Sequence, residues 1–439
     1  MKSTLTAKLL QTLTPWRDAP AWQIAYSGGL DSTVLLHLLA DLAKTQPLPP
    51  LQAIHVHHGL QAAADAWPAH CQAVCDAAGV PLRVMRVQVQ SGASLERAAR
   101  DARYQAFAEA IGPGELLLTG QHRDDQAETL LFRLLRGAGV RGLTGMPAQR
   151  SLGGGHLMRP LLEVSRAELE TYAREQQLSW IEDPSNGDPR FSRNYLRHHV
   201  FPVLTARWPQ AVNSLARTAG HLAQAQGLLD ELAQLDMQAA QLPSAFPWLA
   251  LPSLALAPLR DLSDARQRNV LRYWLAPLTA MPDSEHWVGW SALRDAKEDA
   301  QPVWRLADGQ LQRCNDRIWW IPTNWSEFSD SPLSWSHPQN PLQLPGNGQL
   351  YFSGHAPEGP LSIRYRQGGE VMDVPGRGRR DLKRLLNETA VPGFIRGRLP
   401  LLYQGSRLMA VANLAGASTG QGDDWQLHWA PPTCDQGLS

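Results

Sequence analysis

The sequence predicts an α/β protein: a doubly wound parallel sheet, then a helical middle domain and a small α+β C-terminal domain. Three observations lead to this fold. Short apolar runs alternate with longer helical stretches over residues 22–120. A glycine-containing hexapeptide separates the first apolar run from the first helical stretch. The length of 439 residues exceeds one ordinary domain and, at roughly 150 residues per domain, suggests about three.

The predicted sheet is built from four apolar runs, at residues 22–26, 53–57, 82–89 and 115–119. Helical segments are expected between and after them, near residues 33–43, 61–78, 95–111 and 124–136. Strands that alternate with helices usually pair in parallel, so this pattern favours a parallel sheet with crossover helices. Residues 1–16 contain no long apolar core and no small-residue cleavage site, so we expect an ordinary helix there, not a signal peptide.

Beyond residue 150, helix-capping and turn-forming residues indicate where helices begin and where the chain turns. Ser165 and Glu168 form a capping box that opens a helix reaching about Gln176. Breaks are expected at the glycine-rich residues 151–155 and at the turn-forming residues 183–189. Two further helices are expected near residues 193–205 and 209–242.

From about residue 243 prolines and tryptophans become frequent, and the proline-rich residues 330–345 look like a linker. We therefore expect a catalytic domain over residues 1–215, a mostly helical domain over 216–335 and an α+β domain over 346–430. The sixteen tryptophans are scattered, so most should be core or interdomain residues and not base-stacking platforms.

The charge balance restricts where a nucleic acid can bind. Lys plus Arg is 41 and Asp plus Glu is 41, which excludes a uniformly basic coat and requires any such site to be a local patch. No apolar run approaches the roughly 18 residues of a membrane span. Four cysteines, Cys71, Cys75, Cys314 and Cys434, form no CxxC pair and no disulfide framework. We therefore expect a cytoplasmic protein with reduced thiols, in which Cys71 and Cys75 are buried.

The strongest local signal is the hexapeptide Ser27-Gly28-Gly29-Leu30-Asp31-Ser32 between the first strand and its helix. Backbone N–H groups at a helix N-terminus favour an anion, the two glycines let phosphate approach closely, and the two serines add hydroxyl donors. A carboxylate beside a phosphate would repel it unless Mg²⁺ bridges the two, so Asp31 predicts a metal. The alternative is a plain strand–helix turn with a capping Asp.

The hexapeptide resembles the PP-loop of the N-type ATP pyrophosphatases, and it is neither GxxxxGK[ST] nor GxGxxG. This resemblance implies a Rossmann-like sheet, ATP as a substrate, adenylation of a second substrate and release of pyrophosphate. It also implies nucleotide contacts from Ser27, Gly28, Gly29, Leu30 and Ser32, with Asp31 as the metal ligand.

Further stretches make the chain similar to the tRNA(Ile)-lysidine synthetase family of PP-loop enzymes. They are HVHHGL at 55–60, LERAARDARY at 95–104, TGQHRDDQAET at 119–129, RGAG at 136–139, RPLL at 159–162, EDPSN at 182–186, RNYLR at 193–197, LKRLL at 382–386 and RGRLPLLY at 396–403. The resemblance is dense over residues 20–200, patchy over 361–412 and weak over 245–345.

This resemblance implies a reaction in two steps. ATP adenylates the wobble cytidine of an isoleucine tRNA with a CAU anticodon, and the amine of free L-lysine then displaces AMP to leave lysidine. The modified tRNA changes its codon and amino-acid identity from methionine to isoleucine. The resemblance implies ATP and Mg²⁺ as cofactors, and we expect a monomer or a homodimer.

Asp125 and Glu128 are three residues apart, so they share a helical face near the ligand-binding end of the sheet. We expect this pair to hold the ammonium groups of lysine; the alternative is an acidic helix N-terminus favoured by the helix dipole. His122 lies just before the same helix, where it would contact phosphate or cytidine if it is not merely structural. With Asp31, these three residues are the predicted catalytic set.

Arg100 and Arg103 share one helical face and are suited to gripping phosphate or carboxylate; a solvated face is the alternative. His57 ends a strand at the same sheet edge and is either near the adenine or a buried structural histidine. These three residues complete the predicted nucleotide-binding set.

Two basic clusters are candidates for binding tRNA. Arg193, Asn194 and Arg197 follow a turn-rich loop, and a solvated basic helix is the alternative. Residues 364–398 carry nine basic and four acidic side chains. The predicted contacts there are Arg379, Arg380, Lys383 and Arg384, unless these residues brace nearby acids within their own domain.

Three other functions compete with this reading. A tRNA thiolation enzyme needs a persulfide cysteine or a cluster held by CxxC pairs, which the sequence lacks. An amide-forming PP-loop enzyme carries a glutaminase partner, and we expect the N-terminal Met1-Lys2 start to leave no room for one. An RNA-binding protein with a dead loop is disfavoured by the intact residues 27–32, Asp125 and Glu128.

Overall fold

The structure, a computed structural model, describes residues 2–59, 62–89, 95–281, 284–297, 300–374, 376–414 and 425–433. Leu60 of the histidine motif and Cys434 lie outside these residues. The chain divides into two compact units, Met1–Leu228 and Leu229–Ser439, and each has its own hydrophobic core. The limits of the three predicted domains stay predictions.

The first unit contains a six-stranded sheet with the strand order β3-β2-β1-β4-β6-β5. Its strands are β1 Trp22–Ala25, β2 Leu51–His57, β3 Leu82–Arg86, β4 Leu116–Leu118, β5 Gln149–Leu152 and β6 Gly155–Met158. All neighbours pair in parallel except β5 and β6, so the predicted parallel sheet is confirmed. The first helices are α1 Lys2–Leu13, α2 Leu30–Ala43, α3 Trp67–Ala78, α4 Leu95–Ala110 and α5 Arg123–Leu134.

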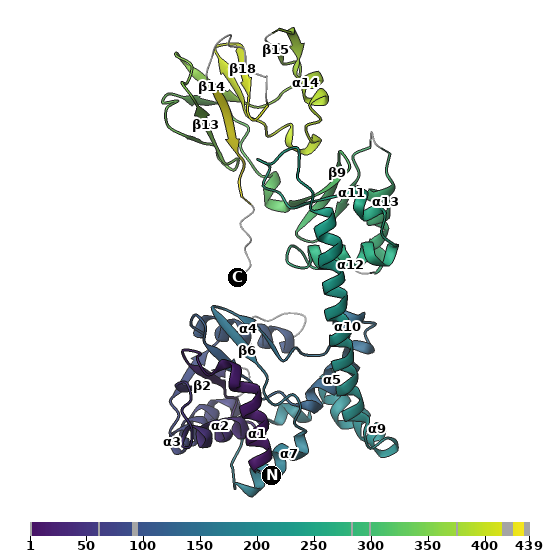
Figure 1. Cartoon of the computed structure of the whole chain (residues 1–439). Coiled ribbons are helices and arrows are strands. Elements are labelled where there is room, and N and C mark those ends of the chain that lie inside the picture. The colour runs from purple at the N-terminus through teal and green to yellow at the C-terminus, as the bar shows by residue number, and fades with distance from the viewer. Residues whose placement is uncertain are drawn as a thin grey trace. The chain divides into compact units, whose positions relative to one another are not determined.

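Helices cover both faces of this sheet (Figure 1). Strand β4 demonstrates why: Leu116 and Leu118 pack into the core that includes α1, α2 and α3, whereas Leu117 packs with Phe107 and Ile111 on the side of α4. Side chains of a strand alternate between faces, so a fully apolar strand requires both faces to be covered. The run of leucines in β4 therefore specifies the central position of this strand.

The glycine-rich break at residues 151–155 is the turn of a hairpin between β5 and β6. Gly153 has a φ of +53°, which favours glycine, and a Cβ on Gly155 would clash with the backbone oxygen of Glu115. Strand β5 is mostly exposed and polar, with the sequence QRSL. The break was predicted, but the two strands were missed because β5 lacks an apolar period.

The remaining helices of the first unit largely follow the sequence. They are α6 Val140–Leu143, α7 Arg166–Glu175, α8 Ser192–Tyr195, α9 Phe201–Arg207 and the long α10 Ala211–Ala240, whose last turns belong to the second unit. The predicted capping box is confirmed, because Ser165 N donates to Glu168 Oε2 at 2.8 Å and Glu168 N donates to Ser165 Oγ at 3.3 Å. A π-helical turn, Leu196–Val200, joins α8 to α9.

The first part of the second unit combines helices with an antiparallel sheet ordered β7-β10-β9-β8. The helices are α11 Leu256–Arg260, α12 Asp264–Leu275 and α13 Val288–Asp295, and the strands are β7 Ser253–Ala255, β8 Val303–Arg305, β9 Gly309–Cys314 and β10 Arg317–Pro322. The helices agree with the predicted helical middle domain, but the sheet was not predicted. Strand β10, with the sequence RIWWIP, is buried at four consecutive positions and therefore lacks the alternation of a half-exposed strand.

The C-terminal part contains a sheet ordered β11-β14-β17-β18, a sheet ordered β12-β13-β19 and a hairpin of β15 and β16. Its elements are β11 Leu333–Trp335, β12 Leu342–Gln343, β13 Gln349–Ser353, β14 Leu361–Arg364, β15 Val371–Val374, β16 Gly378–Asp381, α14 Leu382–Glu388, β17 Leu401–Gln404, β18 Arg407–Val411 and β19 Gln426–Ala430. This α+β composition agrees with the prediction.

The proline-rich residues 330–345 are not a linker. Strand β11 pairs with β14, and Trp335 and Leu344 are buried in the same core as the surrounding sheets. The linker prediction was wrong because prolines are frequent here and because a strand of three residues is too short to show a periodic pattern. Eleven of the sixteen tryptophans are buried, which confirms that most are core residues.

In the described part of the chain, no helix has the length and apolar character required to cross a membrane.

Candidate active site at the carboxyl edge of the sheet

The PP-loop occupies the turn between β1 and α2, as the sequence predicted. Gly28 has a φ of +84°, and a Cβ at this position would lie 2.6 Å from Ile181 Cδ1 and 3.0 Å from Cys71 Sγ. Ile181 N also donates a hydrogen bond of 2.8 Å to the Gly28 carbonyl oxygen. The segment around Ile181 thus packs against the loop and is hydrogen-bonded to it, and only glycine fits at position 28.

The two serines of the loop hold its shape from within. The hydroxyls of Ser27 and Ser32 lie 3.1 Å apart, and Ser32 Oγ donates to the Gly29 carbonyl oxygen at 3.0 Å. Gly29 N donates to Ser27 Oγ at 3.3 Å, and Leu30 is buried as the first residue of α2. The loop therefore places backbone N–H groups at the start of a helix, an arrangement that favours a phosphate.

His122 lies fully buried among three carboxylates. Its Nε2 is 3.6 Å from Asp31 Oδ1 and 3.6 Å from Asp125 Oδ2, and its Nδ1 is 3.7 Å from Asp124 Oδ2. Burial lowers the pKa of His122, but Asp124, Asp31 and Asp125 outweigh burial and raise the pKa to about 10. The imidazole is therefore a cation at neutral pH and joins the PP-loop helix α2 to the start of α5.

Asp125 and Glu128 lie on one face of α5, as predicted, and two arginines face them. Arg197 donates from Nε and Nη2 to the two carboxylate oxygens of Glu128, at 2.7 and 2.9 Å, and its Nη2 lies 3.3 Å from Asp125 Oδ1. Arg193 lies 3.3 Å from Glu128 and 3.9 Å from Asp125. Two carboxylates and two guanidinium groups thus form one neutral cluster, in which Glu128 is only 3% exposed.

This cluster joins residues for which the sequence predicted different roles. Arg193 and Arg197 were predicted to contact tRNA, whereas Asp125 and Glu128 were predicted to hold lysine. Asn194, the third predicted tRNA contact, donates its amide to the carbonyl oxygens of Ser185 and Asp188, at 2.8 and 3.0 Å. All five assignments stay predictions.

The end of β2 carries His57, which is buried and lies 3.3 Å from Asp65. Nearby, Arg103 Nε donates to His58 Nε2 at 3.1 Å, whereas the Arg100 guanidinium lies 5.0 Å from the centroid of the Tyr104 ring. Arg100 and Arg103 therefore have different neighbours, although they share a helix face. Their predicted nucleotide contacts stay predictions, as does that of His57.

Cys71 and Cys75 are fully buried, as predicted, and neither is in a disulfide. Burial raises the pKa of the Cys71 thiol to about 12 and that of Cys75 to about 11. Both thiols are therefore protonated at neutral pH and unreactive. Cys71 instead packs against the PP-loop, where its Sγ lies 3.5 Å from His55 Nδ1.

Two residues near the loop were missed by the sequence analysis. Asp124 contacts His122 and accepts a hydrogen bond of 2.9 Å from Arg166 N at the start of α7. A Cβ on Gly120 would lie 3.0 Å from the backbone carbon of Asp31, so this glycine permits the close approach of two backbones. The position of Gly120 directly after a predicted strand is the signal that could have identified it.

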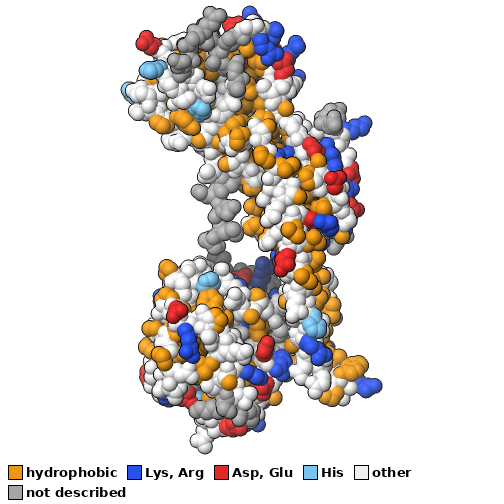
Figure 2. Space-filling view, in the orientation of Figure 1, with side chains coloured by type: hydrophobic (Ala, Val, Ile, Leu, Met, Phe, Trp, Pro, Cys, Tyr) orange, Lys and Arg blue, Asp and Glu red, His pale blue; other side chains and the backbone are white. Residues whose placement is uncertain are grey.

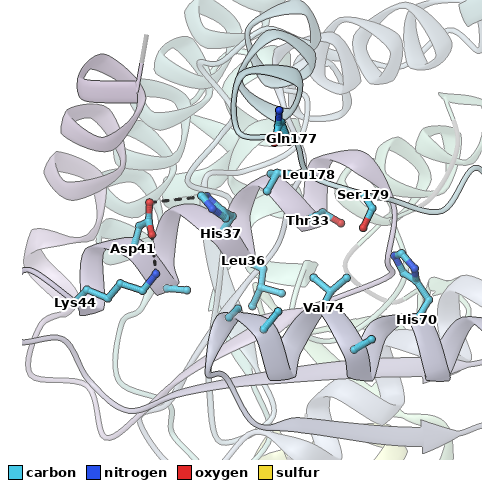
Figure 3. A pocket seen from close by; sticks show the side chains of 14 residues that line it. Thr33, Leu36, His37, Asp41, Lys44, His70, Val74, Gln177, Leu178 and Ser179 are labelled. Atoms are coloured by element: carbon cyan, nitrogen blue, oxygen red, sulfur yellow. Dashed lines mark hydrogen bonds and ion pairs between the residues drawn. The ribbon is translucent and has the colours of Figure 1, made fainter.

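A pocket of about 420 Å³ lies between α2, α3 and residues 177–179 (Figure 3). Its apolar floor includes Leu36 and Val74, and polar groups such as Asp41 and Lys44, 3.0 Å apart, lie at its rim. None of the predicted site residues lines this pocket. The candidate site is therefore the open edge of the sheet and not this pocket.

Basic side chains lie over β15 and α14 in the second unit, with acidic groups among them (Figure 2). Arg377 and Arg384 are paired with Glu388, at 2.8 and 3.0 Å. Arg379, Arg380 and Lys383 have no ion pair to any residue that the structure describes. The basic group thus has two parts. Arg377 and Arg384 are ion-paired with Glu388, whereas Arg379, Arg380 and Lys383 form no ion pair among the described residues.

Comparisons with known proteins agree with this geometry. Family models match a PP-loop domain over residues 1–204, a TilS substrate binding domain over 254–319 and a TilS substrate C-terminal domain over 361–429. The chain is 65% identical to the tRNA(Ile)-lysidine synthase of Pseudomonas fluorescens, over 99% of this chain and 98% of that protein. It is 61% identical to the enzyme of the same name from Pseudomonas aeruginosa, over 99% of both chains. The corresponding protein of Escherichia coli O157:H7 is 41% identical over 89% of this chain and 91% of its own length. The resemblance noted in the sequence is confirmed, and the chain belongs to the tRNA(Ile)-lysidine synthase family.

Proposed function

We propose that this protein uses ATP to join free L-lysine to the wobble cytidine of an isoleucine tRNA with a CAU anticodon. ATP adenylates the cytidine and pyrophosphate leaves; the amine of lysine then displaces AMP and forms the new carbon–nitrogen bond. One observation carries the proposal. A phosphate loop, a buried histidine cation and a pair of carboxylates meet at the carboxyl edge of one parallel sheet.

The loop residues fit the phosphates of ATP. Gly28 permits the tight turn because a Cβ there would clash with Ile181, and the backbone N–H groups that begin α2 attract negative charge. The imidazolium of His122 lies on the same side, next to Asp31, and would stabilise negative charge that develops on a phosphate. Pyrophosphate is a better leaving group when such charges are already in place.

The position of Asp31 is suitable for holding Mg²⁺ together with the ATP phosphates. Its Oδ1 is buried and makes no hydrogen bond within the described structure, although His122 Nε2 lies 3.6 Å away, so this oxygen can still accept a ligand. No group of three or more His, Cys, Asp or Glu residues among the described residues is arranged to hold a metal. Mg²⁺ is commonly bound by one or two carboxylates plus substrate phosphates, so a single Asp is sufficient. When bound, Mg²⁺ would neutralise phosphate charge.

Asp125 and Glu128 are our proposed partners for the lysine ammonium groups. Arg193 and Arg197 compete for the same oxygens, so lysine must share or displace these contacts. Displacement frees guanidinium groups for the phosphates of tRNA, to which the sequence assigned them. Lysine binding by the acids and tRNA binding by the arginines would then occur in the same state of the cluster, after lysine has displaced the arginines.

The tRNA substrate requires a cytoplasmic location, with which the free thiols of Cys71, Cys75 and Cys314 are consistent. Incubation of the protein with ATP, lysine and an isoleucine tRNA transcript, followed by mass analysis of nucleosides, tests the proposed function. We expect the cytidine to gain the mass of lysine less one water. A transcript with uridine at the wobble position is the control. Modification of both transcripts, or of neither, would contradict the proposal.

A further inference from the structure

Three arginines surround one tyrosine at the edge of the sheet beyond the PP-loop. The guanidinium groups of Arg100 and Arg150 lie 5.0 and 4.9 Å from the centroid of the Tyr104 ring. Arg159 is close enough to the same tyrosine to be one of the charges that lower the pKa of Tyr104. These residues come from α4, β5 and the end of β6, so the fold brings them together from three elements.

This cluster has no carboxylate to balance it. Within the described residues, neither Arg100, Arg150 nor Arg159 forms an ion pair. Arg159 is only 4% exposed, and its Nε makes no hydrogen bond, although its Nη1 donates to the Pro147 carbonyl oxygen at 2.7 Å. Burial raises the pKa of Tyr104, but the arginines outweigh it and leave the pKa below its ordinary value. Both observations indicate uncompensated positive charge.

The cluster lies on the same edge of the sheet as the proposed active site. Arg159 directly follows β6, and Leu161 pairs with His122 in an isolated parallel bridge. Arg150 faces Leu157 in the register of the β5–β6 hairpin. In the strand order, β6 is two strands from β1, which at about 4.8 Å per strand is roughly 10 Å.

We propose that Arg100, Arg150 and Arg159 bind a phosphate group of the tRNA backbone next to the reacting cytidine. The inference rests on the proposed function. It assigns Arg100 to the tRNA in place of its predicted nucleotide contact, and it adds Arg150 and Arg159, for which the sequence predicted no role. Arginine presents a planar fork that matches phosphate oxygens, and three arginines without an ion pair among the described residues supply the positive charge for one phosphodiester. The PP-loop, where we propose that the ATP phosphates bind, is two strands away in the sheet order, so we assign this phosphate to the RNA.

The site is tested with Arg150→Ala, since Arg150 is exposed and its loss should not affect folding. Binding of the isoleucine tRNA transcript is measured at several salt concentrations, for wild type and variant. One lost phosphate contact should flatten the slope of log affinity against log salt by about 0.7, the value for a single strand. Arg174→Ala, an exposed arginine on α7, is the matched control for net charge and should leave the slope unchanged. Arg159→Lys keeps the charge but loses the fork, and should weaken tRNA binding without flattening the slope as much.

A second measurement distinguishes the two sources of phosphate. If Arg150→Ala raises the KM for ATP and leaves the salt slope of tRNA binding unchanged, the assignment to RNA is overturned in favour of the nucleotide. If neither quantity changes in a variant with wild-type melting temperature, the anion site itself is overturned. Absence of lysidine in the wild-type reaction would instead contradict the proposed function, so the two failures are distinguishable.

Discussion

The imidazole Nε2 of His122 lies 3.6 Å from Oδ1 of Asp31, and this contact links the helix that begins at the PP-loop with the helix that begins after β4. Both helices have their N-termini here, and a helix N-terminus disfavours a cation by about 0.3–1 kcal/mol. Asp31, Asp124 and Asp125 supply three opposing negative charges and outweigh that effect. The cation is thus maintained by its carboxylates and depends on them.

The first prediction concerns pH. The pKa of His122 is raised from 6.5 to about 10 in the folded protein, so its contribution to stability is fully present below pH 6.5 and is lost as pH rises to about 10. We expect His122→Asn to lower the free energy of unfolding most at pH 6.5 and least at pH 10. Denaturant unfolding at several pH values measures this difference. His221→Asn, at an exposed position of α10, is the control, and a His122→Asn effect that is constant with pH would contradict the ion pairs.

Asp31→Asn should decrease pyrophosphate release by about 100-fold or more, because it removes the proposed Mg²⁺ ligand, and losing one preorganised group that stabilises transition-state charge has an effect of this size. The affinity for tRNA should stay close to wild type, because Asp31 lies at the PP-loop and not among the basic residues. Pyrophosphate release and tRNA binding are measured separately. Asp41→Asn, on the same helix α2, is a control that should release pyrophosphate normally. Normal release by Asp31→Asn at ordinary Mg²⁺ would exclude the metal role.

Gly28→Ala should abolish ATP binding and lower stability. A left-handed backbone costs a non-glycine residue about 1–2 kcal/mol, and here the added Cβ also meets Ile181 at 2.6 Å. Gly59→Ala separates the two effects, since Gly59 also has a positive φ, of +63°, but nothing lies within 4 Å of its Cβ position. Thermal melting and nucleotide titration of both variants check the result. Equal losses in the two variants would show that the clash is unimportant.

Local patterns explain what the sequence predicted correctly. The PP-loop, the parallel strands and the Ser165–Glu168 capping box each depend on residues within a few positions of one another. The burial of Cys71 and Cys75 also follows from helical spacing. In each case local geometry and tertiary packing favour the same conformation, so the local sequence pattern is sufficient to predict the structure.

Contacts between distant segments explain what the sequence did not predict. Arg197 and Glu128 are 69 positions apart, and no spacing rule relates them. The sequence therefore assigned one to tRNA and the other to lysine, although they are ion-paired. The same holds for Arg100 and Arg150, which meet at Tyr104 only because the β5–β6 hairpin was folded next to α4.

Asp125→Asn and Glu128→Gln should raise the KM for lysine more than the KM for ATP, because the two acids share one face of α5 and are our proposed partners for the ammonium groups of lysine. Glu128→Gln should also destabilise the fold by about 3–5 kcal/mol, since it leaves Arg197 partly buried without its main partner. The double variant Glu128→Gln/Arg197→Gln should recover part of that stability but not the lysine affinity. Steady-state kinetics and denaturant unfolding check the two effects. A change in the KM for ATP alone would assign these acids to the nucleotide.

The final prediction concerns the basic group of the C-terminal part, where tRNA binding and structural bracing are alternatives. Arg377 and Arg384 are bound to Glu388, whereas Arg379, Arg380 and Lys383 have no ion pair in the described structure. Replacing the three unpaired cations by Ala should weaken tRNA binding, by an amount that shrinks as salt rises, because phosphate contacts release counterions. The maximal rate at saturating tRNA should change little, since the proposed chemical groups all lie before residue 130.

Arg384→Ala is the matched control for bracing, because it removes a cation from the same helix together with an ion pair. It should affect the melting temperature more than the triple variant does, although exposed ion pairs contribute little. Arg379 faces Asp373 across the β15–β16 hairpin, so a small effect of the triple variant on melting is also expected. If the triple variant instead melts far below wild type and its folded fraction binds tRNA normally, these side chains brace the domain. The second tRNA contact would then have to lie elsewhere on the chain.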